Sequence, residues 1–241
     1  MSTTPRPSPY RFDGSQLAAE YGATRSRIRS LLSGISDSTA ATTVPSCPDW
    51  SVVDLCAHLA GVCADLAAQR GPTGDTQAWV DAQVSDRRGR TVDSLLDEWD
   101  TAGPAFEKLI EARPGSMGGL LYDIVAHEHD ARGALGMPGE RSTIGVLASV
   151  DIMRAMLDRD LAAHGLGGVR LATPRHEWVA GTGEVELTLR LDGDDAEWEL
   201  MRMIGSRRTL DQVLGAPWQG DVARFLPGLA HLPLPRNDLS E

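Results

Sequence analysis

Apolar residues recur at helical spacing through most of the first 165 residues. Apolar side chains three or four positions apart share one face of a helix, so this spacing predicts amphipathic helices. Most of these segments are bounded by a capping residue, a glycine or a proline. The predicted helices span residues 14–35, 51–70, 91–112, 121–136 and 142–165. They predict an antiparallel helical bundle with one long connection.

Three local signals refine this prediction. Ser51 stands three residues before Asp54, a spacing typical of a capping box at a helix start. Pro104 lies inside the helix 91–112 and should kink or split it, or open its second half. Residues 71–90 are polar and rich in glycine, so they predict a connection between helices.

The pattern changes after about residue 166. Two segments are strand-like, and in the second, residues 183–195, apolar residues alternate strictly with polar ones. The next apolar segment, residues 194–206, could form a hairpin strand, but its spacing and closing glycine favour a helix. Two short helices are predicted over 209–215 and 221–229, before a proline-rich tail. This part predicts a small α+β domain.

Composition narrows the class of protein. At 241 residues the chain can form one large or two modest domains, and 41% hydrophobic residues are ordinary for a globular protein. A net charge of -11 argues against nucleic acid as a partner, since the nearest basic cluster is the short segment 85–90. No apolar run approaches the ~20 residues of a membrane span. The N-terminus has no signal-peptide core, so we expect a cytoplasmic protein.

The three cysteines do not suggest a structural metal site or a disulfide framework. They are Cys47, Cys56 and Cys63, an odd number with no CxxC pair. Cys56 and Cys63 are seven residues apart on one helix face, and we interpret them as small buried side chains.

One predicted helix gathers several polar side chains. The segment LYDIVAHEHDARGALG, residues 121–136, contains two of the six histidines of the chain. Asp123 and His127 are four residues apart, so both can reach one ion from the same face. His129 points in a different direction. Asp130, three residues after His127, is close enough to orient that imidazole from outside the ligand set.

A carboxylate and one imidazole need a further ligand to form a metal site. His58 is the best candidate, because it lies mid-helix among residues that should face the bundle core. Two histidines and one carboxylate leave coordination positions open, as catalytic metal sites do. The residues alone leave two alternatives open. His58 could be a hydrogen-bonded core histidine, and Asp123 with His127 could be an ordinary helix contact.

Three segments carry a family pattern. The first is VPSCPDWSVVDLCAHLAGV, in which a Pro-x-Trp and a later leucine are followed by a His-Leu pair. The second is DIVAHEHDARGALG, in which a carboxylate precedes a His-x-x-Asp and the segment ends in Ala-Leu-Gly. ELMRMIGSRRT is an apolar segment ending near Gly-Arg, followed by the Trp-x-Gly-Asp of APWQGD. In this order they resemble the signatures of the mycothiol-dependent maleylpyruvate isomerase family. The resemblance covers most of the chain.

This resemblance implies a DinB-like four-helix bundle that holds a divalent metal, usually zinc, and a small C-terminal α+β domain. The metal ligands that it implies are His58, Asp123 and His127. The family carboxylate is commonly Glu, so Asp123 reaches one methylene less far. Trp50 also matches the family pattern, and we interpret it as a core anchor at the helix entry. We expect a disordered lead (1–14), a metal-binding bundle (15–165) and an α+β domain (166–235).

The resemblance also implies the chemistry. The family thiol is mycothiol, a sugar thiol of low molecular weight, and a thiol on zinc is deprotonated near neutral pH. We therefore expect an enzyme that acts on a small electrophile by cis–trans isomerisation or by S-transfer. The alternatives are a non-catalytic relative that binds a small molecule or partner, and a purely structural metal. Because histidine binds metal only when neutral, metal affinity should fall below about pH 6.

The C-terminal signature points to an arginine. The chain has GSRR where the family has Gly-Arg, so either Arg207 or Arg208 fills that position. Arginine binds carboxylates through a planar fork, and one of the two is expected to hold an anionic part of the thiol or substrate. A solvated pair at a helix boundary is the alternative. The expected partners are a thiol and a small electrophile, with the chain a monomer or homodimer.

Overall fold

The computed structural model describes residues 11–239 and residue 241. Contacts divide this part of the chain into two units, with the division between Gly139 and Glu140. Most of the predicted disordered lead, residues 1–10, lies outside the described residues. The first helix begins at Gly14, where Asp13 and Gln16 form a capping box.

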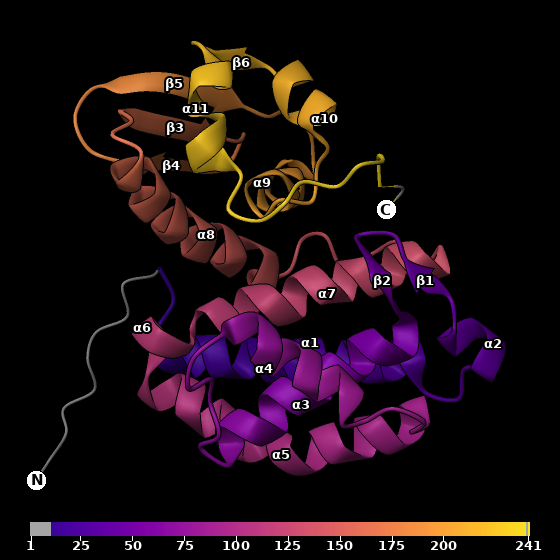
Figure 1. Cartoon of the computed structure of the whole chain (residues 1–241). Helices are drawn as coiled ribbons and strands as arrows, with labels where there is room; N and C mark the ends of the chain where they lie inside the picture. Colours follow the sequence, from indigo (N-terminus) through magenta and orange to yellow (C-terminus); the bar gives the residue numbers. More distant parts are fainter. Residues whose placement is uncertain (1–10, 240) are drawn as a thin grey trace, which may run out of the picture. The chain divides into compact units, whose positions relative to one another are not determined.

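Four long helices form the N-terminal unit (Figure 1). They are α1 (Gly14–Leu32), α3 (Val52–Ala67), α5 (Val92–Ala112) and α7 (Gly119–Leu135). α1 and α3 each pack against both α5 and α7, which is the arrangement of a four-helix bundle. The shorter elements of this unit are α2 (Asp37–Ala40), β1 (Thr43–Val44), β2 (Cys47–Ser51), α4 (Thr76–Ser85) and α6 (Pro114–Met117). The predicted helical bundle is confirmed.

The bundle core contains a cluster of aromatic side chains from α1 and α5. Trp99 and Phe106 of α5 are fully buried, and the Trp99 indole donates a hydrogen bond of 3.1 Å to the Tyr21 hydroxyl of α1. The Tyr21 and Phe106 rings meet edge to face with centroids 4.9 Å apart. Cys56 and Cys63 are also buried, as predicted, and burial raises the pKa of each thiol to about 12.

Two local predictions for the bundle need correction. α5 is one continuous helix with Pro104 inside it, so the predicted split does not occur. The segment 71–90 contains the helix α4, which packs along α3. This helix was not predicted because nine of its ten residues are at least partly exposed, so it has no apolar stripe. The capping box of Ser51 and Asp54 is present at the start of α3.

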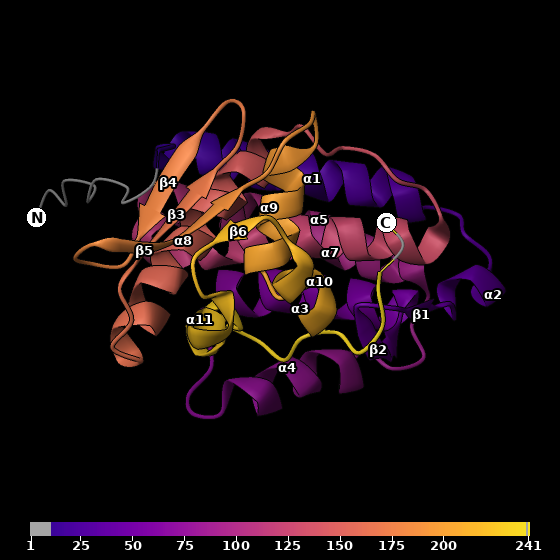
Figure 2. The same cartoon turned by 90° about the horizontal axis from the view of Figure 1, so that it is seen from above.

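The C-terminal unit combines a sheet with helices, as predicted. Its strands are β3 (Gly168–Ala172), β4 (Glu177–Ala180), β5 (Val185–Arg190) and β6 (Trp218–Gln219). The sheet thus has two strands, β4 and β6, beyond the two strand-like segments of the prediction. They follow one another in the order β4-β3-β5-β6, visible in Figure 2. β3 and β5 are parallel, whereas β4 and β6 pair antiparallel with their neighbours. The helices are α8 (Ile144–Ala163), α9 (Ala196–Ile204), α10 (Leu210–Gly215) and α11 (Val222–Leu229).

The observed division of the chain lies one helix before the boundary expected near residue 165. α8 packs against α9, α11 and β4 of the C-terminal unit. Trp178 of β4 donates a hydrogen bond of 2.6 Å to Asp151 of α8, which ties the helix to the sheet. The four-helix bundle is complete without α8, because α1, α3, α5 and α7 supply its four members.

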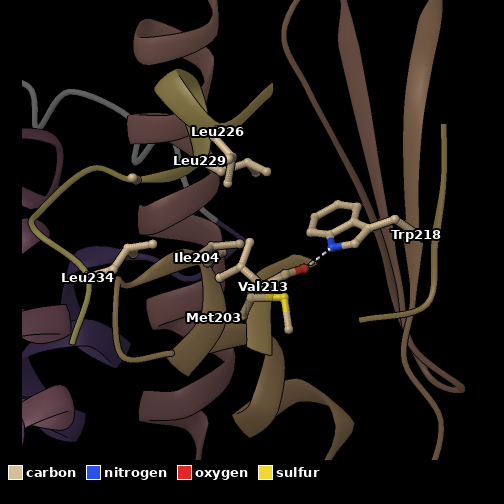
Figure 3. Close-up of a pocket in the computed structure, with 8 residues that line it drawn as sticks. Met203, Ile204, Val213, Trp218, Leu226, Leu229 and Leu234 are labelled. Carbon is tan, nitrogen blue, oxygen red and sulfur yellow. Dashed lines mark hydrogen bonds between the residues drawn. The ribbon is translucent and has the colours of Figure 1, made fainter. Parts of the chain in front are cut away.

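An apolar cavity lies inside the C-terminal unit (Figure 3). It is bordered by side chains of α9, α10 and α11 and by Trp218, whose indole donates a hydrogen bond of 2.7 Å to the Val213 carbonyl. The cavity offers about 10 Å³, which is at the lower limit for one water molecule. It is therefore a packing gap in the core of this unit. None of the helices in the described part of the chain is long and apolar enough to cross a membrane.

Candidate metal centre in the helical bundle

Two histidines from different helices converge on one carboxylate. His58 of α3 places Nε2 3.4 Å from one oxygen of Asp123, and His127 of α7 places Nε2 3.5 Å from the other oxygen. Suitable ligand atoms of the three residues all lie within 4.8 Å of one another. The structure thus brings together the three predicted ligands, and the shorter reach of Asp123 is sufficient for this convergence. That they bind a metal remains a prediction.

The second ring nitrogen of each imidazole, Nδ1, also has a polar partner. Nδ1 of His127 is 3.0 Å from a carboxylate oxygen of Asp130, as expected from their spacing on α7. Nδ1 of His58 is 3.0 Å from the amide oxygen of Gln83 on α4. In the neutral form of each imidazole, a proton on Nδ1 leaves the Nε2 lone pair directed at Asp123, which is the tautomer that a metal ligand requires.

Trp50 lies against both imidazoles. Its ring centroid is 4.9 Å from that of His58 and 5.9 Å from that of His127. The residue comes from β2 and is only partly buried, so the interpretation of Trp50 as a core anchor needs correction. Trp50 forms one wall of the candidate site. The two imidazoles meet edge to face, with centroids 5.3 Å apart.

The electrostatics of His127 change the expected pH dependence. Burial lowers its pKa, but the hydrogen bond to Asp130 and contacts with Cys47 and Asp123 outweigh burial and raise the pKa to about 10. In the metal-free protein His127 is therefore protonated at neutral pH. A metal must therefore compete with this proton at pH values well above about 6, the limit expected for a histidine with an unperturbed pKa.

Cys47 forms a second cluster with two of these residues. Its thiol, His127 and Asp130 also have ligand atoms within 4.8 Å of one another. Both clusters use His127, whose Nδ1 is already paired with Asp130. We favour the cluster with His58, because there two Nε2 atoms face a carboxylate and both Nδ1 atoms are held. No sequence pattern marked Cys47, since it lies eleven residues before His58 and in no metal-binding spacing.

The opposite side of α7 has a structural role. Glu128 is fully buried, and both of its oxygens accept hydrogen bonds from Arg27 of α1, at 3.0 to 3.1 Å. Arg132, one turn further along α7, also donates to Glu128 at 3.0 Å. This ion-pair cluster joins α1 to α7. The polar residues of the segment 121–136 therefore serve two purposes, one on each side of the helix.

Asp123 is the most exposed member of the candidate site. Its side chain is 30% exposed, whereas those of His58 and His127 are 5% and 7% exposed. Because solvent reaches the carboxylate of Asp123, a further ligand can approach the site from that side. Such a set is typical of metal sites that bind and activate small molecules.

The predicted arginines lie in the C-terminal unit, directly after α9. Both are largely buried, so they are not a solvated pair. Arg208 forms two hydrogen bonds of 2.7 Å with Glu199 and lies over the Trp198 ring. Arg207 donates to the Gly205 carbonyl at 3.4 Å. A role for either in binding a substrate remains a prediction.

The fold and the site define the class of the N-terminal unit: a four-helix bundle with two histidines and one carboxylate gathered between α3 and α7. Residues 21–132, which include all three, match the family model described as the mycothiol maleylpyruvate isomerase N-terminal domain. This part of the chain is therefore similar to that domain.

Solved structures agree with this assignment at the level of the fold. The chain is similar to the crystal structure of the mycothiol-dependent maleylpyruvate isomerase, with a TM-score of 0.55 at 10% identity. It is also similar to a histidine-to-alanine mutant of that enzyme, with a TM-score of 0.57 at 11% identity. Each comparison covers 81% of this chain and 90% of the other. The sequence has no significant match among the curated proteins compared.

Proposed function

We propose that this protein is a metal-dependent enzyme that uses mycothiol to act on a small electrophile, by isomerisation or by S-transfer. The observation that carries the proposal is the convergence of the His58 and His127 Nε2 atoms on the Asp123 carboxylate. The family of the N-terminal unit supports mycothiol as the thiol. Zinc is the proposed metal, because it accepts imidazole and carboxylate ligands and leaves a position open in catalytic sites.

The residues present fit such an ion. His58 and His127 would bind through Nε2, with Gln83 and Asp130 holding the proton on each Nδ1. Asp123 would add a negative charge that partly neutralises a divalent ion. When bound, zinc would hold a thiol as thiolate near neutral pH, which free thiols with a pKa near 8.5 scarcely reach. The Trp50 ring lies against both imidazoles and would border a bound ion.

The proposal is tested by metal analysis combined with thiol consumption. Purified protein loaded with zinc should bind about one ion per chain, as expected for one site. With an activated alkene or another electrophile, the protein should consume mycothiol if it catalyses S-transfer. If it catalyses isomerisation, it should convert the substrate without net loss of mycothiol. Protein that folds but binds no metal would favour the non-catalytic alternative. Zinc binding without any thiol-dependent reaction would favour a structural or binding role.

Cys47→Ser distinguishes the two candidate clusters. If zinc binds to His58, Asp123 and His127, this variant should keep the same stoichiometry and affinity, because the thiol is not among the ligands. If the cluster of Cys47, His127 and Asp130 binds the ion, the variant should lose most of its affinity, and His58→Ala should not. The assignment of the site then follows from which of the two variants loses zinc.

We also propose that Arg207 or Arg208 binds an anionic group of the thiol or substrate. Loss of a charged hydrogen bond worth about 1.5–3 kcal/mol would lower kcat/KM by roughly tenfold or more. Arg207→Ala and Arg208→Ala should be measured separately, with zinc content as the control. Arg208→Ala also breaks the pair with Glu199, so its thermal stability must be measured as well. Wild-type kcat/KM in both variants would contradict this role.

A further inference from the structure

Gln83 is the residue by which α4 reaches the interior of the bundle. Of the ten residues of α4, all of them described in the structure, Gln83 is the only buried one, and it is 1% exposed. A helix on a bundle surface usually attaches through an apolar stripe. α4 attaches through a polar amide, and the group that this amide contacts is the His58 imidazole.

The amide at this position is unfavourable for packing alone. Its oxygen accepts a hydrogen bond from Nδ1 of His58 at 3.0 Å, but its nitrogen has no hydrogen-bond partner among the described residues. A buried donor without a partner is unfavourable, because it has lost its hydrogen bonds to water. A methionine of nearly the same shape would avoid this cost. The contact of the amide oxygen with His58 is the interaction that glutamine makes here and methionine could not.

Two further contacts fix the amide in place. Gly61 lies one turn after His58 on α3, and a Cβ atom there would stand 2.7 Å from Cβ of Gln83. Only glycine allows α4 to approach α3 this closely. At the end of α4, Arg87 donates to the Gln83 carbonyl at 3.2 Å and forms an ion pair of 2.6 Å with Glu98 of α5. Gln83 is thus held from both its side chain and its backbone.

We propose that Gln83 is a positioning residue for the candidate metal site. It keeps the His58 proton on Nδ1, so that the Nε2 lone pair faces Asp123 and is available to an ion. Gln83 is not itself a ligand, since it touches the nitrogen of His58 that points away from Asp123. The inference rests on the proposed function for the identity of the ion, but the tautomer of His58 can be measured without any metal.

The first experiment uses the metal-free protein. Nitrogen chemical shifts of the His58 ring, recorded by NMR at pH 8, report which nitrogen carries the proton. The wild type should show the Nδ1–H form. Gln83→Met, which keeps the length of the side chain but has no acceptor of comparable strength, should shift His58 towards the Nε2–H form. A wild-type protein with Nε2–H would overturn the proposal, whether or not the protein binds zinc.

The second experiment measures zinc affinity by competition with a chelator. Gln83→Met should weaken binding by about 10–100-fold, the usual effect of losing a partner that orients a ligand. Gln83→Glu keeps an acceptor oxygen at the same reach, so it should bind zinc more tightly than Gln83→Met even though it adds a buried charge. The thermal stability of Gln83→Met should not fall, because a buried unpaired donor is removed. Equal zinc affinity in wild type and Gln83→Met, or equal weakening in the Met and Glu variants, would contradict the role.

Two controls separate positioning from folding. Gln77→Met changes a glutamine on the exposed part of the same helix and should leave zinc affinity unchanged. Gly61→Ala leaves Gln83 intact but displaces it from His58, and should weaken zinc binding in the same direction as Gln83→Met. If the wild type shows Nδ1–H but binds no zinc, the proposed function fails, and what stands is that Gln83 fixes the tautomer of His58.

Discussion

His127 and His58 present the same nitrogen to Asp123, but the chain supports the two imidazoles differently. His127 is supported by Asp130, a charged group three residues away on the same helix. His58 is supported by Gln83, a neutral group 25 residues away on another helix. A carboxylate stabilises a protonated imidazole, whereas an amide oxygen only directs one proton to Nδ1.

The comparison shows how one site can combine two properties. The support from Asp130 makes His127 a more basic ligand, and this is visible in its raised pKa. The support from Gln83 orients His58 without adding charge next to the ion. Two carboxylates behind two histidines, together with Asp123, would place three negative charges in a largely buried space. The neutral amide avoids the third charge and its desolvation cost.

Removing either imidazole should have the largest effect. His127→Ala leaves one histidine and one carboxylate, and zinc affinity should fall by more than the roughly 100-fold expected for loss of a supporting group. Elemental analysis after gel filtration would show little or no zinc. The fold should survive on the core around Trp99 and Phe106, and circular dichroism would check this. Equal zinc in variant and wild type would remove His127 from the site.

Removing the charge behind His127 should have the next largest effect. Asp130→Asn keeps an oxygen near Nδ1 but removes the negative charge, so zinc affinity should fall by about 10–100-fold. It should also lower the pKa of His127, because the hydrogen bond to Asp130 is the largest cause that raises it. NMR titration of His127 in the metal-free variant would measure the shift. An unchanged pKa would mean that Cys47 and Asp123 suffice to raise it.

The pH dependence of zinc binding follows from the raised pKa of His127. Since that pKa is about 10, His127 carries a proton between pH 6 and pH 8, and zinc must release it. Competition with one proton should make zinc affinity rise about tenfold for each pH unit over this range. In the metal-free protein the same group stabilises the fold below about pH 6.5, and this contribution is lost as the pH rises through about 10.

The measurement is chelator competition at several pH values. Wild-type protein should show the full slope between pH 6 and pH 8, and Asp130→Asn a shallower one at the upper end. A zinc affinity that does not change with pH would show that no protonated histidine is displaced. In that case the ligands would have to be groups that are already deprotonated.

The smallest effect is expected for the neighbouring histidine. His129→Ala should leave zinc content and its pH dependence unchanged, because His129 belongs to neither of the clusters that could hold an ion among the described residues. It is two residues from His127 and leaves the helix in another direction. This variant is therefore the matched control for His127→Ala. Loss of zinc in both would mean that α7 itself has been disturbed.

The sequence by itself determined the parts of the site that depend on helical geometry. Asp123, His127 and Asp130 share one side of α7 because residues three and four apart always do so in a helix. The core position of His58 followed from the apolar residues around it on α3. The long amphipathic helices, the capping box at Ser51 and the change to strands after residue 166 were predicted for the same reason: each is a local pattern.

Only the tertiary structure decided which side chains meet across elements. Gln83 lies on a helix without an apolar stripe, so no periodicity marked either the helix or the residue. Cys47 and Trp50 reach the imidazoles because the ribbon of β1 and β2 packs near α3 and α7. Glu128 accepts hydrogen bonds from Arg27, which is 101 residues away in the chain. Such contacts depend on how the helices pack against one another. Packing is decided by the apolar surface that many residues bury together, and no local spacing in the sequence contains that information.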